Sequence, residues 1–240
     1  LYIVSLAADG SVQATSKVSS TTGGFNGPLG VGDHFGSALA SLGDLDGDNL
    51  IELAVGAPYD DDTGENSGSV WILSIDNNGA VTAEERISAS AGGLGAALDV
   101  GDHFGASLAM IGDHDSDGVQ DLAVGAPGDD DGFENAGAVH ILRMSTAGTV
   151  NSDSKISSAG GGSNVDLGVG DDFGMAIANA GDLNSDGIDD LFVGAPDSDD
   201  FADNGGSAWL LPFATEFYDC DGNGVPDECD PDCDANGRPD

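Results

Sequence analysis

Short apolar runs separated by glycine-rich or acidic turns recur along the chain with a period of 69 residues. Each period holds a run of small residues, an apolar run that proline ends, a run that begins with an aromatic or histidine side chain, and a run that follows a glycine turn. These runs are too short for helices and are bounded by turn residues, so each predicts a β-strand. In one period they are residues 37–42, 53–57, 71–73 and 81–87.

The repeat predicts an all-β fold, because four antiparallel strands form one blade of a β-propeller. Counting strands gives the last two of a preceding blade, two full blades and three strands of another, hence two full and two partial blades. Since propellers close with about four to eight blades, we expect either a piece of a longer protein or a ring or row completed by other copies. The predicted units are residues 1–20, 21–89, 90–158 and 159–218, followed by an acidic, cysteine-containing tail at 219–240.

An acidic loop joins the first two strands of each period, with oxygen-bearing side chains at relative positions 1, 3, 5 and 9. Alternate residues of a tight turn direct carboxylates at one point, and Gly or Asn at position 6 permits a positive φ. The carbonyl of position 7 adds a ligand, whereas valine at position 12 excludes an EF-hand. The predicted Ca²⁺ ligands are Asp44, Asp46, Asp48, Leu50 and Glu52; Asp113, Asp115, Asp117, Val119 and Asp121; and Asp182, Asn184, Asp186, Ile188 and Asp190.

The charge balance excludes two classes of partner. The chain has 5 Lys+Arg against 44 Asp+Glu, a formal net charge of -39, whereas nucleic acids and anionic membranes bind cationic surfaces. No apolar run of about 18 residues occurs, so we expect no membrane insertion. Converging carboxylates repel one another without a counterion, which favours bound cations with a structural role. Calcium loops and cysteines confined to the tail are typical of a secreted, extracellular or cell-surface setting.

The motifs follow one another in a constant order: Phe-Gly, Leu-Ala, Gly-Asp, the acidic loop and Val-Gly-Ala-Pro. This succession resembles the FG-GAP repeat of integrin α-subunit propellers and of many secreted bacterial proteins, over residues 1 to about 213. The resemblance implies Ca²⁺ on one face of a propeller, and adhesion to or binding of a protein or glycan ligand. Glu52 departs from the family pattern, which has Asp at that position, and the three loops leave the ring size open.

The tail is similar to thrombospondin type 3 repeats, which are calcium-packed spacers. This resemblance implies further Ca²⁺ ligands at Asp219, Asp221, Asn223, Asp227 and Asp230. Three cysteines (Cys220, Cys229 and Cys233) leave one without a partner within the tail, and their pairing stays open.

Three further sets of residues recur every 69 positions, and each has two readings. The acidic loops after each proline (60–66, 129–135 and 197–204) predict either second cation sites or a solvated rim. Asp33, Asp102 and Asp171 are expected to cap turns, the alternative being an approach to a neighbouring calcium loop. Lys17, Arg86 and Lys155 either blunt the outermost strands against pairing or bridge to an acidic loop of a neighbouring blade or chain.

No catalytic constellation is recognisable, since both a nucleophile elbow and a dinucleotide loop are missing from the sequence. We therefore expect a non-enzymatic, extracellular, calcium-binding scaffold for adhesion or ligand binding. One alternative is a subunit of a calcium-dependent extracellular filament or matrix, a homo-oligomer or polymer in which other copies complete the partial blades. A minor alternative is the non-catalytic part of a larger secreted enzyme.

Overall fold

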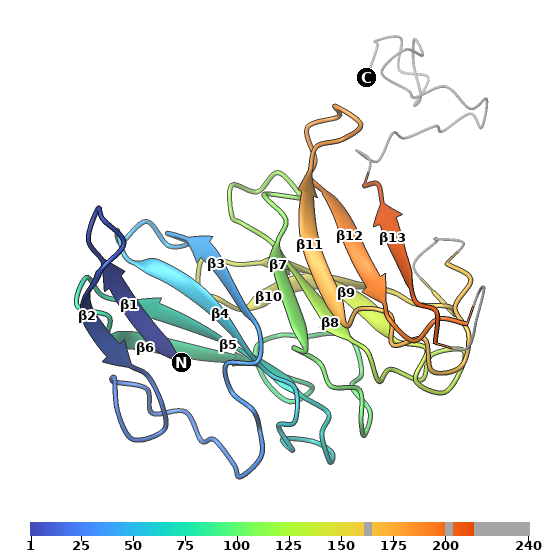
Figure 1. Ribbon diagram of the computed structural model, residues 1–240, viewed down its shortest axis with the longest axis horizontal. Helices are drawn as coiled ribbons and strands as arrows, with labels where there is room; N and C mark the ends of the chain where they lie inside the picture. The colour runs from blue at the N-terminus through green and yellow to red at the C-terminus, as the bar shows by residue number, and fades with distance from the viewer. Residues whose placement is uncertain (161–164, 200–203, 214–240) are drawn as a thin grey trace, which may run out of the picture.

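A computed structural model describes residues 1–160, 165–199 and 204–213, and every regular element in this part is a β-strand (Figure 1). None of the described residues forms a helix with the length and apolar character needed to cross a bilayer. The described residues form thirteen strands: β1 (Tyr2–Leu6), β2 (Val12–Lys17), β3 (Leu39–Gly43), β4 (Ile51–Ala57), β5 (Ser69–Ile75), β6 (Val81–Ile87), β7 (Ser107–Met110), β8 (Leu122–Ala126), β9 (Ala138–Met144), β10 (Val150–Ile156), β11 (Ala176–Gly181), β12 (Asp190–Ala195) and β13 (Ser207–Leu211).

The strands form four antiparallel sheets, and within each sheet neighbours in space are neighbours in sequence. β1 pairs with β2, β3 to β6 form one four-stranded sheet, β7 to β10 form the next, and β11 to β13 form a three-stranded sheet. This arrangement confirms the predicted all-β fold with two full and two partial blades. The first strand of the repeat begins at Leu39 rather than at the predicted residue 37, because the Ser37 amide donates to the His34 carbonyl (3.0 Å) and closes a turn.

Successive sheets pack face to face, with their first strands adjacent. β7 lies between β3 and β11 (Figure 1). Apolar side chains of facing sheets form the core, for example Ile72 of one full blade with Leu122 and Met144 of the next. Burial of such side chains is worth about 1.5–3 kcal/mol each, so each blade depends on its neighbour for a closed core.

The Phe-Gly and Val-Gly-Ala-Pro motifs meet at the seams between blades. Phe104 is fully buried and forms an isolated parallel bridge with Gly68 of the preceding blade. A Cβ atom added to Gly56 would lie 2.0 Å from the carbonyl oxygen of Gly105. Only glycine permits this backbone approach, so the two motifs position adjacent sheets.

Two kinds of loop lie at opposite ends of the sheets. The β3–β4, β7–β8 and β11–β12 connections, which contain the predicted calcium loops, lie at one end, uppermost in Figure 1. The β4–β5 and β8–β9 connections, which contain the acidic loops after proline, lie at the other end. The alternation follows from antiparallel pairing, in which successive connections leave a sheet at opposite ends. The predicted calcium loops and the acidic loops after proline are therefore separated by the length of the sheets.

Candidate calcium loops and the acidic loops opposite

Each predicted calcium loop folds around the carboxylate at its first position. Asp44 accepts hydrogen bonds from the amides of Gly47 (2.8 Å) and Asn49 (3.0 Å), one to each carboxylate oxygen. The corresponding carboxylates, Asp113 and Asp182, also accept two amides each from their own loops. These hydrogen bonds fix the position of the first carboxylate inside each loop.

Two residues in each loop have left-handed backbone. Position 6 was expected to have a positive φ, and it does, at 70° for Asn49, 91° for Gly118 and 93° for Gly187. Sequence reasoning missed position 4, where φ is 79° for Gly47, 62° for Ser116 and 66° for Ser185. Serine rarely adopts a positive φ, so at position 4 only Gly47 could have predicted this conformation from its residue type. Two such turns close together bring alternate side chains to one side of the loop.

Carboxylates converge in the first two loops. In each of them three ligand oxygens, one per residue, lie within 4.8 Å of one another. The third loop is less anionic because Asn184 stands at position 3, and its Nδ2 donates to Asp186 Oδ2 (3.0 Å) and to the Phe213 carbonyl (2.7 Å). Converging oxygens are the ligand set that Ca²⁺ takes in proteins. The converging residues are Asp44, Asp46 and Asp48 in the first loop and Asp113, Asp115 and Asp121 in the second.

The carboxylate at position 9 is buried in every loop. Asp121 is fully buried, and it accepts the amide of His114 on Oδ2 and the amide of Met144 on Oδ1, both at 2.8 Å. Burial raises the pKa of Asp121 to about 6, while these two hydrogen bonds act in the opposite direction. A bound cation would favour the charged form. Asp190 accepts the corresponding amides of Leu183 and Phe213.

Glu52 holds position 9 of the first loop and leaves one oxygen unsatisfied. Its Oε2 accepts the Leu45 amide (2.7 Å), as Asp121 accepts His114. Its Oε1 is buried without a hydrogen-bond partner among the described residues, and the residue is 4% exposed. A buried carboxylate oxygen without a partner is costly. The all-oxygen donor set and this orphaned atom fit a site for a cation.

The predicted ligands at position 7 contribute backbone carbonyls. Leu50, Val119 and Ile188 lie in the loops, and their amides donate to the position 5 carboxylates at 2.7, 2.8 and 2.9 Å. Coordination by their carbonyls stays a prediction. The tail ligands Asp219, Asp221, Asn223, Asp227 and Asp230 lie outside the described residues.

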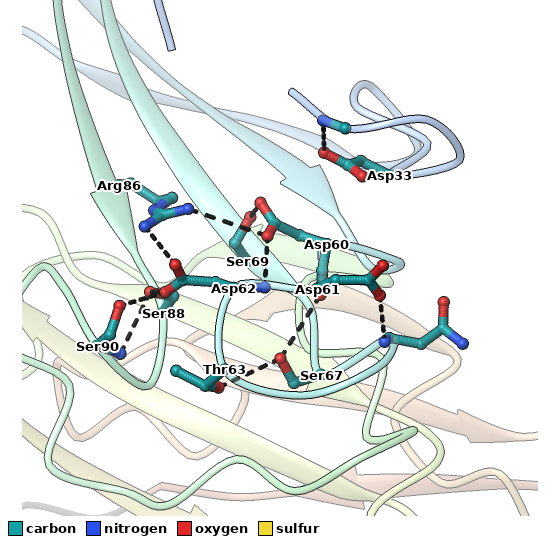
Figure 2. Close-up of polar contacts among 12 residues, drawn as sticks. Asp33, Asp60, Asp61, Asp62, Thr63, Ser67, Ser69, Arg86, Ser88 and Ser90 are labelled. Atoms are coloured by element: carbon teal, nitrogen blue, oxygen red, sulfur yellow. Dashed lines mark hydrogen bonds and ion pairs between the residues drawn. The ribbon is translucent and has the colours of Figure 1, made fainter. Parts of the chain in front are cut away.

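At the opposite end, the acidic loop after β4 forms ion pairs with a cation of its own blade (Figure 2). Arg86 Nη2 lies 2.6 Å from Asp62 Oδ1, and Arg86 Nη1 lies 4.0 Å from Asp60 Oδ1. The other Asp62 oxygen accepts the hydroxyls of Ser88 (2.6 Å) and Ser90. The alternative that Arg86 bridges to a neighbouring blade is therefore wrong, because the loop returns over its own outermost strand.

The next blade repeats the arrangement with lysine. Lys155 Nζ contacts Asp129 Oδ2 and lies 2.6 Å from Asp131 Oδ2. Burial works against the charge of Lys155, but the hydrogen bonds to Asp129 and Asp131 raise its pKa overall. The outer two aspartates thus hold a cation of the chain itself, while residues 130–135 are exposed, as a solvated rim requires.

The middle aspartate of each acidic loop closes the loop. Asp61 accepts the amide of Asn66 at 2.8 Å, and Asp130 accepts that of Asn135 at 2.7 Å. In the third period Asp199 accepts the Asn204 amide at 2.7 Å. The recurring asparagines have positive φ, which Asn tolerates better than most residues. These asparagines are Asn66, Asn135 and Asn204.

Asp33, Asp102 and Asp171 cap turns, as predicted. They accept the amides of Gly30 (2.6 Å), Asp99 (2.7 Å) and Gly168 (2.8 Å), respectively, each three residues back. All three are buried. Burial raises the pKa of Asp102 to about 7, although the Asp99 amide opposes the shift.

A cross-strand pair of an aromatic residue and a cation recurs in three sheets and was missed from the sequence. The pairs are Tyr2 with Lys17, Trp71 with Arg86, and His140 with Lys155. Lys17 Nζ lies 5.8 Å from the Tyr2 ring centroid, and Arg86 Cζ lies 5.7 Å from that of Trp71. His140 is fully buried, and burial lowers its pKa to about 3, so it is a neutral ring. The aromatic or histidine positions and the cation positions recur with the same period, and this shared period is the sequence signal that could have revealed the pairs.

Known proteins share this repeat. The family model described as FG-GAP repeat matches residues 35–73, 104–142 and 173–211. Similar proteins include integrin alpha-3 of Mus musculus (34% identical over 165 residues), integrin alpha-PS5 of Drosophila melanogaster (32% over 166 residues) and integrin alpha-4 of Xenopus laevis (34% over 165 residues). Each alignment covers 69% of this chain but only 14% or 15% of the relative's length. The family matches do not reach the tail.

Proposed function

Since the chain carries three FG-GAP repeats and is similar to integrin alpha subunits, we propose that it is a calcium-stabilised, non-enzymatic binding module of an extracellular protein. The similarity to integrins supports the extracellular setting and the binding role, and FG-GAP repeats are typically non-catalytic. The proposal also rests on the predicted calcium loops, which lie at equivalent places in successive blades.

The observation that carries the calcium part is the convergence of oxygen ligands on a buried carboxylate. Asp113, Asp115 and Asp121 place one oxygen each within 4.8 Å of one another, and Asp121 is fully buried immediately before β8. Close, unneutralised carboxylates repel, whereas Ca²⁺ accepts six to eight oxygens at about 2.3–2.6 Å. Bound Ca²⁺ would supply charge neutralisation and a crosslink.

Such a crosslink would restrain the parts of the blade that supply its ligands. Positions 1, 3 and 5 belong to the connection after the first strand, whereas position 9 lies in the second strand (Glu52 and Asp190) or immediately before it (Asp121). A cation held between them would tie the loop to the sheet. At a tenfold excess over Kd, each occupied site adds about 1.4 kcal/mol to the free energy of unfolding. Three sites together make a large contribution to a typical domain stability of about 5–15 kcal/mol.

Calcium titration of the whole chain tests this part of the proposal. Isothermal titration calorimetry of metal-free protein should report at least three sites, and an Asp44→Asn variant should weaken one of them. Glu65→Gln removes the same charge at the opposite end and serves as the matched control. Equal weakening in both variants would show non-specific attraction to an acidic protein and would contradict the loop sites.

The partner is proposed to be a protein or glycan bound by the loops at one end of the sheets. The alternative is a filament of copies of the chain. Sedimentation at several protein concentrations, with calcium and with chelator, separates the two. A monomer that stays monomeric in calcium supports the binding module, whereas calcium-dependent polymers support the filament and contradict the monomeric module.

A further inference from the structure

The two full blades hold the same acidic loop with different cations. In each blade two aspartates of the loop face a cation of the outermost strand, which is Arg86 in the first blade and Lys155 in the second. A guanidinium stays protonated in proteins, whereas a lysine amine can lose its proton and act as a nucleophile. The second blade therefore has a group that can form a covalent bond at a place where the first blade has none.

The two aspartates beside Lys155 differ in their exposure to solvent. Nζ of Lys155 contacts Oδ2 of Asp129 and lies 2.6 Å from Oδ2 of Asp131. The side chain of Asp129 is 3% exposed, whereas that of Asp131 is 53% exposed. A groove of about 520 Å³, whose lining includes Asp131 and Lys155, opens this place to solvent. One carboxyl group is thus held away from water beside the amine, while the other can exchange protons with water.

A hydroxyl that restrains the buried aspartate of the first blade is missing from the second. In the first blade Ser69 Oγ donates to Asp60 Oδ2 at 2.8 Å. One repeat later Ala138 stands at the position of Ser69. The corresponding oxygen, Oδ2 of Asp129, therefore has the nitrogen of Lys155 as its neighbour in place of a hydroxyl.

The exposed aspartate is also less restrained in the second blade. In the first blade Asp62 Oδ2 accepts the hydroxyls of both Ser88 and Ser90. One repeat later Ala159 replaces Ser90, and the partner of the Asp131 carboxylate is the lysine ammonium. Asp131 is therefore better placed than Asp62 to take a proton from the cation that it faces.

The surroundings of Lys155 favour loss of charge. His140 lies directly opposite Lys155 in the sheet and is fully buried against Phe104, with ring centroids 5.2 Å apart. Burial lowers the pKa of His140 to about 3, and the charge of Lys155 acts in the same direction, so the ring is neutral. Charges beside such a neutral, buried ring are costly to desolvate. Conversion of the ammonium and a carboxylate into an amide would remove two of them at once.

We propose that Lys155 and Asp129 join in an intramolecular isopeptide bond, with Asp131 as the proton carrier and one water molecule as the by-product. Burial opposes the charge of Lys155, but the hydrogen bonds to Asp129 and Asp131 raise its pKa overall, so the amine starts as an ammonium. Asp131 takes one proton from Nζ and passes it to Oδ2 of Asp129. The free amine then attacks Cγ of Asp129.

The reaction balances without an outside reagent. The bond from Nζ of Lys155 to Cγ of Asp129 forms, the bond from Cγ to Oδ2 breaks, and Oδ2 leaves as water with the two protons that Nζ has lost. Nothing is oxidised or reduced, and Asp131 ends unchanged. The amide of Asp131 donates to Oδ1 of Asp129 at 2.9 Å, so it can stabilise the negative charge that develops on this oxygen. Holding the two groups together corresponds to an effective concentration of about 10⁵–10⁸ M.

The bond would tie the β8–β9 connection covalently to β10, the outermost strand of the same blade. This inference goes beyond the proposed function, because neither calcium binding nor partner binding requires the crosslink. The preceding blade would keep its ion pair, since Arg86 cannot act as a nucleophile.

Mass spectrometry of the whole chain, kept in calcium and then reduced at its cysteines, tests the proposal. The intact mass should be lower than that of the sequence by the mass of one water molecule. Peptide mapping should find one branched peptide in which Asp129 is joined to Lys155. An unreacted mass in protein stored for days would overturn the inference, and so would a branch at any other residue.

Two variants and a control assign the roles. Lys155→Arg, which gives this blade the cation of the preceding one, should abolish the loss of water. Asp131→Ala keeps both bonding residues and should slow crosslinking by about 100-fold, as expected for loss of a proton carrier. Lys17→Arg changes the lysine at the equivalent position of the first sheet and should crosslink like the wild type.

The variants also distinguish the crosslink from other dehydrations. A loss of water that persists in Lys155→Arg would point to a succinimide between Asp131 and Gly132 and would overturn the inference. An unchanged rate in Asp131→Ala would overturn the role of Asp131. Calcium stoichiometry, measured in the same samples, bears on the proposed function alone, so the two can fail separately.

Discussion

Nη2 of Arg86 lies 2.6 Å from Oδ1 of Asp62, inside a single blade. The same guanidinium lies over the ring of Trp71, and the Arg86 side chain is 21% exposed. Although burial opposes it, the hydrogen bonds from Ser88 and Ser90 and the charge of Arg86 together lower the pKa of Asp62. Arg86 therefore joins the outermost strand, the third strand and the acidic loop of its blade.

Replacing Arg86 with methionine should destabilise the protein by about 1–3 kcal/mol. The change leaves Asp60 and Asp62 without their cation, and the partial exposure of the pair reduces the cost below that of a fully buried one. Urea unfolding in saturating calcium measures the effect. Arg86→Lys is the matched control and should retain most of the stability, because Lys155 does the same work in the next blade. Equal losses of unfolding free energy in Arg86→Met and Arg86→Lys would contradict a role for the positive charge.

Asp102 makes stability depend on pH. Burial raises its pKa to about 7, above the ordinary value of 3.8. The folded protein therefore holds a proton that the unfolded chain releases, and this contribution is fully present below the unfolded pKa and lost as the pH rises through about 7. Unfolding free energies between about pH 5 and pH 8 should fall more steeply for the wild type than for Asp102→Asn, by up to a few kcal/mol.

Saturating calcium in both series keeps the metal loops out of the Asp102 comparison. Asparagine retains an oxygen that can accept the Asp99 amide, so the turn cap is preserved. Parallel pH profiles for the two proteins would show that Asp102 is ionised alike in the folded and unfolded states, contrary to this account.

The seams should be sensitive to a single methyl group. A Cβ added at Gly56 would lie 2.0 Å from the Gly105 carbonyl of the next blade, so Gly56→Ala should cost about 2 kcal/mol or more. Gly194 holds the same motif position, but a Cβ there would meet its nearest described atom at 3.5 Å, an ordinary contact. Gly194→Ala should therefore cost less than about 1 kcal/mol. Thermal unfolding of both variants in calcium measures these losses of stability. Equal losses in the two variants would contradict the close approach of the two motifs at the seam.

Much of the fold was predictable because its determinants are local and repeated. The run that ends at Pro58 and the turn before Val81 set strand ends that the structure places as expected, with β4 at Ile51–Ala57 and β6 at Val81–Ile87. The positive φ of Asn49 also follows from residue type alone. Local chemistry repeated in register therefore supports prediction of sheets and loops.

The ion pairs were not predictable in the same way, because they depend on how distant strands align. Asp62 and Arg86 are 24 residues apart, and whether they meet depends on the path of the loop over β6. A run of aspartates is also the usual composition of a solvated surface. Similarly, the burial of Glu52 Oε1 without a hydrogen-bond partner among the described residues depends on packing, which the spacing of acidic residues does not show.

Individual calcium loops should be separable by mutation. Asp113→Asn removes a proposed ligand that also accepts the amides of Asp117 and Gly118. The affinity of one site should fall at least about tenfold, while the other loops keep theirs. Glu134→Gln removes one charge from the opposite end and should leave every site unchanged. Calorimetric titration that finds all sites weakened together in Asp113→Asn would contradict independent loops.

The most direct test of the central claim is thermal unfolding of the whole chain in calcium and in EDTA, with the calcium content of the purified protein measured alongside. Three occupied loops at tenfold excess contribute about 4 kcal/mol, since each site adds about 1.4 kcal/mol. We therefore expect bound calcium and a melting temperature about 10 °C or more higher in calcium than in EDTA. A protein that contains no calcium and melts at the same temperature in both solutions would contradict it.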